Sequence, residues 1–233
     1  MEGKSSTRVA TDQRSARRDE VRGAILAAAR TALRNDGPMG VAVRGVCRDA
    51  GVPATSFYRH FPDRVALMNQ LRVEAYTTLA ARVRQALQTC APGDHQAECR
   101  AAARATRRWS HESRDDFYLL YGETHAEWQA DQRVCGLRIT TGLLVGTVLE
   151  RAIATGQLAP RKPTAGLHDP TEAWRADDGP LSPIAHELTM HFWAAVVGFL
   201  MLEPCRGSEI VDPEAFFESY LDLLMAGMGF AVD

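Results

Sequence analysis

The chain has 233 residues, of which 45% are hydrophobic and 24% are charged. This balance is typical of an ordinary globular protein with a core of its own and excludes a disordered or collagen-like chain. The net charge of −2 is unevenly distributed. Residues 1–61 carry 11 Lys and Arg residues against 6 acidic ones, and the remaining residues carry 16 against 23. A basic front on an acidic body indicates a partner with phosphate groups at that end.

Cysteine usage and hydropathy restrict the class of protein further. The five widely spaced cysteines are Cys47, Cys90, Cys99, Cys135 and Cys205. No pair has CxxC spacing, so we expect reduced thiols rather than a zinc site or redox couple. The polar, Arg-rich N-terminus predicts no signal peptide, and the longest apolar run, residues 192–202, is too short to span a bilayer. We expect a cytoplasmic protein with no membrane partner, no metal and no cofactor.

The N-terminal quarter predicts a basic arm followed by three short helices. Residues 1–18 are polar and basic without periodicity, which predicts a flexible arm. From Asp19 a helical apolar stripe begins, and residues 35–38 (Asn-Asp-Gly-Pro) carry the stop signals that end this helix. Two further helices are predicted over residues 43–50 and 53–60. Gly51 makes the turn between them, and the small Cys47 allows the close crossing that a helix-turn-helix requires.

The rest of the chain also predicts helices, with one exception. The predicted spans are 62–91, 94–112, 115–130, 133–155, 184–203 and 213–229. Between the spans 133–155 and 184–203, residues 156–183 contain five prolines and predict a long loop. The cluster 104–108 (RATRR) predicts a solvated charged face. No strand alternation stands out, so the predicted fold class is all-α.

Residues 50–67 resemble the signature of the TetR family of transcriptional regulators, which runs A-G-V-S-x-G-T-L-Y-x-H-F-x-S-K-E-x-L. The identical positions are Ala50, Gly51, Val52, Tyr58, His60, Phe61 and Leu67, with conservative changes at Ser56, Phe57 and Arg64. The resemblance covers about residues 19–70. It implies a helix-turn-helix DNA-binding domain at 19–62, followed by a helical effector-binding and dimerisation domain at 63–233.

The resemblance, with the chemistry of the side chains, gives a set of DNA-binding candidates: Arg44, Thr55, Ser56, Tyr58, Arg59, His60 and Arg64. The two hydroxyls lie early on the third helix, where they can reach bases or phosphates. Arg64 replaces the family's phosphate-binding Lys. Simple packing for Tyr58 and bracing of the helix for His60 are the alternatives. The family's usual Thr at the start of the second helix is absent, since Val41 and Ala42 stand there.

Two further sets of candidates lie in the C-terminal two-thirds. An apolar stripe on the last two helices predicts a dimer interface of Phe192, Val196, Phe199, Phe217, Leu221, Leu224 and Met228. An adjoining stripe holds Phe216, Tyr220 and Leu223. Aromatic and polar tips predict a ligand pocket lined by Trp109, Tyr121, His125 and Trp128. For both sets the alternative is burial in the core of a monomer.

These features predict a sequence-specific regulator and not an enzyme. The expected protein is a homodimeric repressor that binds a pseudo-palindromic double-stranded DNA operator and is released by an unidentified small-molecule effector. An activator or an effector-independent regulator fits the same residues. An all-α enzyme or small-molecule carrier centred on His125 or His191 is the alternative from another class. The histidines of 186–191 (HELTMH) are five residues apart, whereas zinc-binding HExxH helices need a spacing of four.

Overall fold

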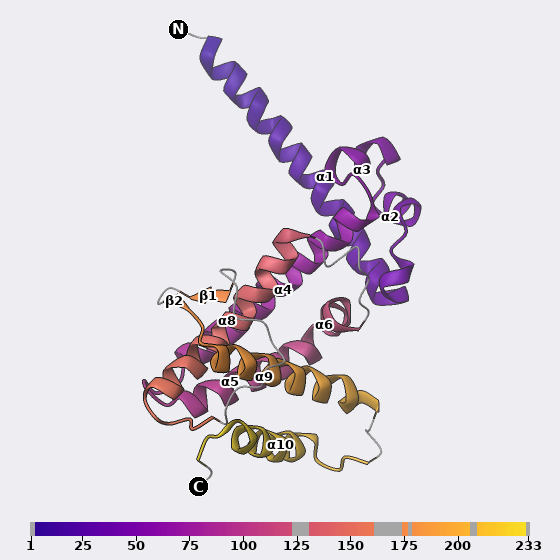
Figure 1. Ribbon diagram of the computed structural model, residues 1–233. Coiled ribbons are helices and arrows are strands. Elements are labelled where there is room, and N and C mark those ends of the chain that lie inside the picture. Colours follow the sequence, from indigo (N-terminus) through magenta and orange to yellow (C-terminus); the bar gives the residue numbers. More distant parts are fainter. Residues whose placement is uncertain (1–2, 123–130, 161–173, 177–178, 206–208, 232–233) are drawn as a thin grey trace. The chain divides into compact units, whose positions relative to one another are not determined.

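The computed structural model describes residues 3–122, 131–160, 174–176, 179–205 and 209–231, without the side chains of residues 3–12, 14 and 175–176. The chain is predominantly helical (Figure 1), which confirms the predicted fold class. In chain order the elements are α1 (Gly3–Gly40), α2 (Val43–Asp49), α3 (Ala54–His60), α4 (Arg64–Gln88), α5 (His95–Glu112), α6 (Arg114–Tyr121), α8 (Gln132–Ala154), β1 (Arg175–Ala176), β2 (Gly179–Pro180), α9 (Pro183–Leu202), the 3-10 turn η2 (Glu203–Cys205) and α10 (Pro213–Met228).

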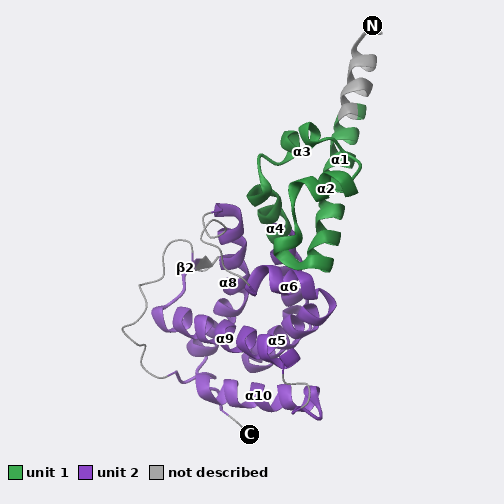
Figure 2. Cartoon of the chain, turned by 90° about the vertical axis from the view of Figure 1, so that its right-hand side faces the viewer, with its two compact units in different colours: residues 1–72 green, residues 73–233 purple. Residues whose placement is uncertain are grey.

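The chain divides into two compact units, residues 1–72 and 73–233 (Figure 2). The division falls within α4, and not at residue 62 where the sequence placed it. The predicted start of the first unit also needs correction. Where a flexible arm was expected over residues 1–18, helix α1 already begins at Gly3. Polar helical turns have no apolar stripe, so the periodicity that marks a packed helix cannot reveal them.

Unit 1 is built around the apolar faces of α1 to α4. Its fully buried side chains include Ile25 of α1, Val46 of α2, Phe57 of α3 and Leu67 of α4. Helix α1 is interrupted at Gly37, whose φ of 67° lies in the left-handed region that glycine tolerates. The predicted stop signal therefore lies where the regular helix breaks, and the last turn continues in a new direction.

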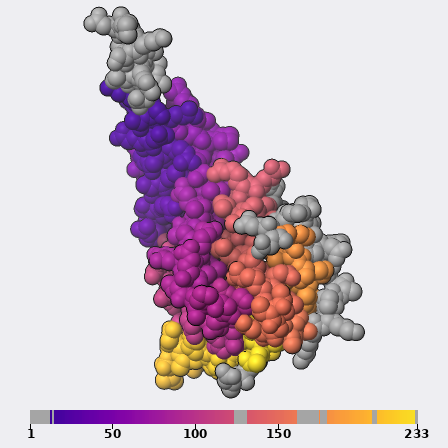
Figure 3. Space-filling view, turned by 90° about the vertical axis from the view of Figure 1, so that its left-hand side faces the viewer, coloured from indigo at the N-terminus to yellow at the C-terminus, as the bar shows by residue number. Residues whose placement is uncertain are grey.

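Unit 2 has one apolar core to which α4, α5, α6, α8, α9 and α10 all contribute. Helices α5 and α8 lie side by side, and α10 covers one end of this unit (Figures 1 and 3). This arrangement corrects most of the predicted dimer interface. Five of its seven side chains are at most 3% exposed and pack inside unit 2, so they cannot contact a second subunit: Phe192, Val196, Phe217, Leu221 and Met228.

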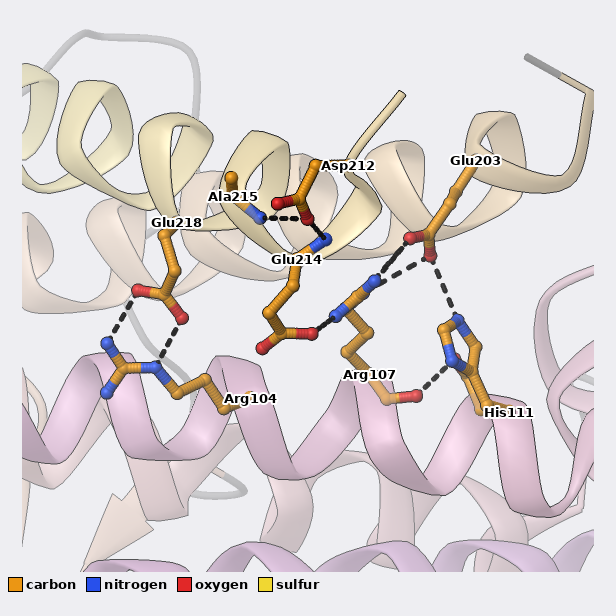
Figure 4. Close-up of polar contacts among 9 residues, drawn as sticks. Arg104, Arg107, His111, Glu203, Asp212, Glu214, Ala215 and Glu218 are labelled. Carbon is orange, nitrogen blue, oxygen red and sulfur yellow. Dashed lines mark hydrogen bonds and ion pairs between the residues drawn. The ribbon is translucent and has the colours of Figure 1, made fainter. Parts of the chain in front are cut away.

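An ionic ladder joins α5 to η2 and α10 (Figure 4). Arg104 makes a double hydrogen bond with Glu218, at 2.6 Å for each N–O pair. Arg107 binds Glu203 at 2.7 Å, also pairs with Glu214, and lies 5.0 Å from the centre of the Phe217 ring. The side chains of Arg107 and Glu203 are each only 10% exposed. The cluster 104–108 is therefore a clamp between helices at these two positions, and not the solvated face that the sequence predicted.

Two carboxylates of this ladder, those of Glu203 and Glu218, have lowered pKa values. Hydrogen bonding from Arg104 lowers the pKa of Glu218 more than partial burial raises it. Burial raises the pKa of Glu203, but hydrogen bonds from Arg107 and His111 outweigh it, so that its pKa is lowered overall. Both interactions stabilise the folded state as long as the carboxylates are ionised.

The region between α8 and α9 is partly ordered by short pairings. Strands β1 and β2 form a two-stranded antiparallel sheet in the described part of the predicted loop, while residues 161–173 lie outside the described residues. Leu158 forms a bridge with Phe230, and Gly229 between α10 and this bridge has φ +107°. A Cβ at Gly229 would lie 2.5 Å from the backbone oxygen of Ala159, so only glycine fits there.

Helix α9 is long and apolar enough to cross a membrane by length and composition, although the run chosen from the sequence was shorter. In unit 2 it contributes Phe192, Val196 and Leu200 to the core. Its first turn begins at Ser182, whose hydroxyl accepts a hydrogen bond from the backbone N–H of Ala185.

Candidate nucleic-acid interface

Helices α2 and α3 form a tight helix-turn-helix. The turn depends on Gly51, whose φ of +67° places it in the left-handed region, and on a 3.0 Å hydrogen bond from the N–H of Val52 to the oxygen of Cys47. Helix α3 is anchored by Phe57, which is fully buried and lies 5.8 Å from the ring of Phe61. The spacing read from the sequence thus matches the packing that fixes the orientation of α3.

The anchored face of α3 leaves its opposite face open to solvent. Thr55, Tyr58 and Arg59 are exposed, and Ser56 and His60 are half-buried. The Tyr58 ring packs edge to face against Phe57, with 5.3 Å between the ring centres, yet 57% of the Tyr58 surface is exposed. Tyr58 is therefore still accessible to a binding partner. These five predicted side chains therefore lie on one short rod within unit 1, a geometry that fits the major groove of DNA.

The two arginines predicted outside α3 have different surroundings. Arg44 is exposed on α2 and is accessible to a binding partner. Arg64 is half-buried and already bonded, because its Nε donates to the oxygen of Val41 at 2.7 Å and its Nη2 donates to the oxygen of Pro38. Ala42, the residue before α2, provides no side-chain cap, and the Arg64 guanidinium holds the segment that precedes this helix. Arg64 thus has a structural role in unit 1, and the phosphate contact that the resemblance implied for it stays a prediction.

A basic groove of about 860 Å³ lies between α1 and α3. It is lined by Arg17, Arg18, Val21, Gly51, Val52, Pro53, Ser56, Arg59 and His60. The sequence interpretation left both α1 arginines in the arm and so missed their convergence with α3. Burial lowers the pKa of His60, and the positive charges of Arg18, Arg22 and Arg59 lower it further, against a weaker opposite effect of Asp19. A prediction that α1 extends back through Arg17 would have placed both arginines on this helix and so indicated the groove.

The structure brings together only part of the predicted ligand pocket. Trp109 and Tyr121 both contact the ring of Phe117, with centroid distances of 6.4 Å and 5.3 Å. Trp109 is 1% exposed and packs in the core of unit 2, and its contact with a ligand stays a prediction. Burial raises the pKa of Tyr121 well above its usual value. His125 and Trp128 lie outside the described residues.

A second groove of about 860 Å³ runs between α9 and α10. Its walls include Phe199, Phe216 and Tyr220. The centre of the Phe199 ring lies 5.6 Å from that of Phe216 and 4.8 Å from that of Tyr220. Phe216 and the nearby Leu223 are 51% and 71% exposed. Of the predicted dimer residues, Phe199 and Leu224 keep partial exposure. The exposed apolar surface is thus the adjoining stripe, which sequence reasoning described but did not choose.

The two histidines of residues 186–191 (HELTMH), of which His191 belongs to the enzyme alternative, have different surroundings. His186 stacks against Trp174 at 4.7 Å between ring centroids, and burial lowers the pKa of His186. His191 is exposed on α9. Among the described residues, no three His, Cys, Asp or Glu side chains lie close enough together to hold a metal ion.

Comparison with known proteins gives consistent results. A family model described as "Bacterial regulatory proteins, tetR family" matches residues 25–71. The chain is 26% identical to the HTH-type transcriptional regulator Mb1846 of Mycobacterium bovis over 216 residues, which cover 90% of this chain and 92% of that protein. A Rhodococcus sp. RHA1 protein of unknown function has a similar structure, with a TM-score of 0.70, 22% identity and coverage of 90% and 95%. The regulator FadR of Bacillus subtilis, solved with stearoyl-CoA, gives a TM-score of 0.64, 14% identity and coverage of 88% and 97%.

Proposed function

We propose that this chain, a transcriptional regulator of the TetR family, is a homodimeric cytoplasmic repressor that a small-molecule ligand releases from its operator. The observation that carries the proposal is the exposed face of α3. Phe57 and Phe61 anchor this helix from below, while Thr55, Tyr58 and Arg59 remain open on its other side. Hydroxyl and guanidinium groups on such a rod can bond both base edges and phosphates.

A dimer is supported by the apolar groove between α9 and α10. This groove is lined by Phe216 and Tyr220, and the exposed Leu223 lies on the same helix. Monomeric proteins rarely leave such a continuous apolar surface in contact with water. Two copies related by a two-fold axis would present two α3 helices. Helices about 34–36 Å apart read half-sites one turn apart, which is why the operator would be pseudo-palindromic.

Release by a ligand is supported more indirectly. The B. subtilis FadR structure contains stearoyl-CoA and shares this fold. In our chain, Tyr121 is half-buried beside Phe117, next to the segment that holds the proposed contacts His125 and Trp128. A ligand that binds better to a state with wrongly spaced α3 helices would shift the population away from the operator.

The test begins with selection of a binding duplex from a randomised library by the full-length chain. Fluorescence anisotropy then gives the Kd of the selected duplex and of a scrambled duplex at several salt concentrations. We expect Arg59→Ala to weaken binding to the selected duplex about tenfold or more. Arg84→Ala is the matched control, because Arg84 is exposed on α4 in unit 2. A chain that enriches no sequence, or that binds both duplexes equally, would overturn the proposal.

The sign of regulation and the oligomeric state need their own measurements. In vitro transcription from a promoter carrying the selected site should fall when the protein is added, and a rise would replace the repressor by an activator. Sedimentation should give a dimer that Leu223→Asp dissociates, because this exposed side chain lies on the proposed surface. A dimer unaffected by Leu223→Asp would place the interface elsewhere.

A further inference from the structure

The groove between α1 and α3 concentrates positive charge. Arg17 and Arg18 enter it from α1, and Arg59 and His60 enter it from α3. All four belong to unit 1. Helix α1 continues beyond this groove and runs past α3 (Figure 1).

Positive side chains predominate in the lining of this groove. In the part of the chain that the structure describes, Arg17, Arg18 and Arg59 have no carboxylate partner in an ion pair. Like charges that line one groove repel each other, and intervening water weakens the repulsion. The pKa of His60 reports this excess, because burial and the neighbouring arginines lower it although Asp19 is near. A negative group in the groove would relieve the repulsion.

The position of the groove indicates the source of that negative group. Ser56 and Arg59 belong to α3 and line the groove from its side, so a duplex read by α3 brings its own backbone to the groove's edge. A DNA strand carries one phosphate about every 3.4 Å along the axis. Guanidinium groups bind phosphate oxygens through two parallel hydrogen bonds, and the Ser56 hydroxyl can donate a third.

We propose that the groove between α1 and α3 holds a backbone phosphate of the operator, clamped by Arg17 and Arg18 on one side and Arg59 on the other. This inference rests on the proposed function. Phosphate contacts fix the register of a protein on DNA without carrying sequence information. Arg17 and Arg18 therefore set affinity and placement, while the exposed face of α3 sets sequence preference.

The experiment compares two double variants of the full-length chain on the selected and the scrambled duplex. Arg17→Ala/Arg18→Ala removes the clamp, and Arg84→Ala/Arg138→Ala removes two exposed arginines of unit 2. We expect the clamp variant to bind both duplexes about tenfold more weakly or worse, with an unchanged ratio between them. Its plot of log Kobs against log salt should lose a slope of about 0.9 for every phosphate contact removed. The control variant should match wild type.

A second readout follows the His60 ring by NMR. Adding the selected duplex should raise the pKa of His60 in the wild-type chain, because a phosphate in the groove stabilises the imidazolium. In the clamp variant this rise should be absent. Circular dichroism and thermal melting of both variants check that the fold is kept, which is expected because Arg17 and Arg18 are exposed.

The outcomes separate this inference from the proposed function. If wild type shows no specific complex, the proposed function itself fails. If wild type binds specifically and the clamp variant has the same Kd and salt slope, only the inference is overturned. A rise in the His60 pKa caused by inorganic phosphate alone, with unchanged DNA binding by the clamp variant, would make the groove a free-anion site and would also overturn it.

Discussion

The buried part of the ionic ladder predicts an unusually costly single substitution, Glu203→Gln. Glu203 and Arg107 are each 10% exposed in their side chains, and their closest N–O distance is 2.7 Å. Removing one member of a buried ion pair leaves the other charge uncompensated, which typically costs about 3–5 kcal/mol. Here the amide keeps one acceptor and Glu214 still binds Arg107, so we expect about 3 kcal/mol, the lower end of that range.

The assay is urea denaturation followed by circular dichroism at one fixed protein concentration, since association of subunits would also change stability. The matched control is Glu112→Gln. Glu112 pairs with Arg82 at 3.1 Å, but both side chains are more than half exposed, so we expect a loss of about 0–1 kcal/mol. Equal effects of the two substitutions, or a loss below about 1 kcal/mol for Glu203→Gln, would refute the argument from burial.

Three further predictions rest on single contacts. Because the folded-state pKa of Glu218 is lowered, its stabilisation is fully present above the ordinary value of 4.5 and is lost as pH falls through the lower folded value. Acid titration of stability should therefore be shallower in Glu218→Gln than in wild type; parallel curves would contradict this. Gly229→Ala should destabilise the chain by at least about 1–2 kcal/mol in thermal melting, whereas Gly227→Ala, in open space within α10, should stabilise it or leave it unchanged. Cys205 is exposed and should react with a thiol reagent in the native state, whereas Cys99, buried and with a raised pKa, should react only on unfolding; rapid native labelling of Cys99 would count against the core described for unit 2.

The helix-turn-helix could be predicted from the sequence because its determinants are local. A glycine turn, a proline start and apolar spacing within 15 or so residues specify α2 and α3. The predicted spans 43–50 and 53–60 agree with Val43–Asp49 and Ala54–His60 within one residue at each end. Exposure of Thr55 followed from the same local reasoning, because burial of Phe57 fixes the outward face.

The outward face of α10 could not be predicted in this way. This helix has two adjoining apolar stripes, and local periodicity does not decide which one packs inward. In the structure, Arg104 and Arg107 of α5 bind Glu218 and Glu214, and these carboxylates share a face with the buried Phe217. Only a pairing between segments more than 100 residues apart selects that stripe. The role of Arg64 was missed for a related reason, since its acceptors are backbone oxygens that no side-chain motif reveals.

The early turns of α1 have a thermodynamic consequence. Among the side chains of α1 that the structure describes, the first buried one is Ile25, and residues 15–20 are all exposed. Helical turns without tertiary packing are marginal in water, since isolated helices below about 12–15 residues rarely hold. Warming should therefore melt these turns well before the cooperative unfolding of unit 1, as a gradual loss of far-ultraviolet ellipticity. Duplex DNA should restore that signal at the same temperature, because binding would refold these turns. The enthalpy of operator binding should therefore change with temperature in the full-length chain, and this change should be absent from a truncated chain that begins at Asp19.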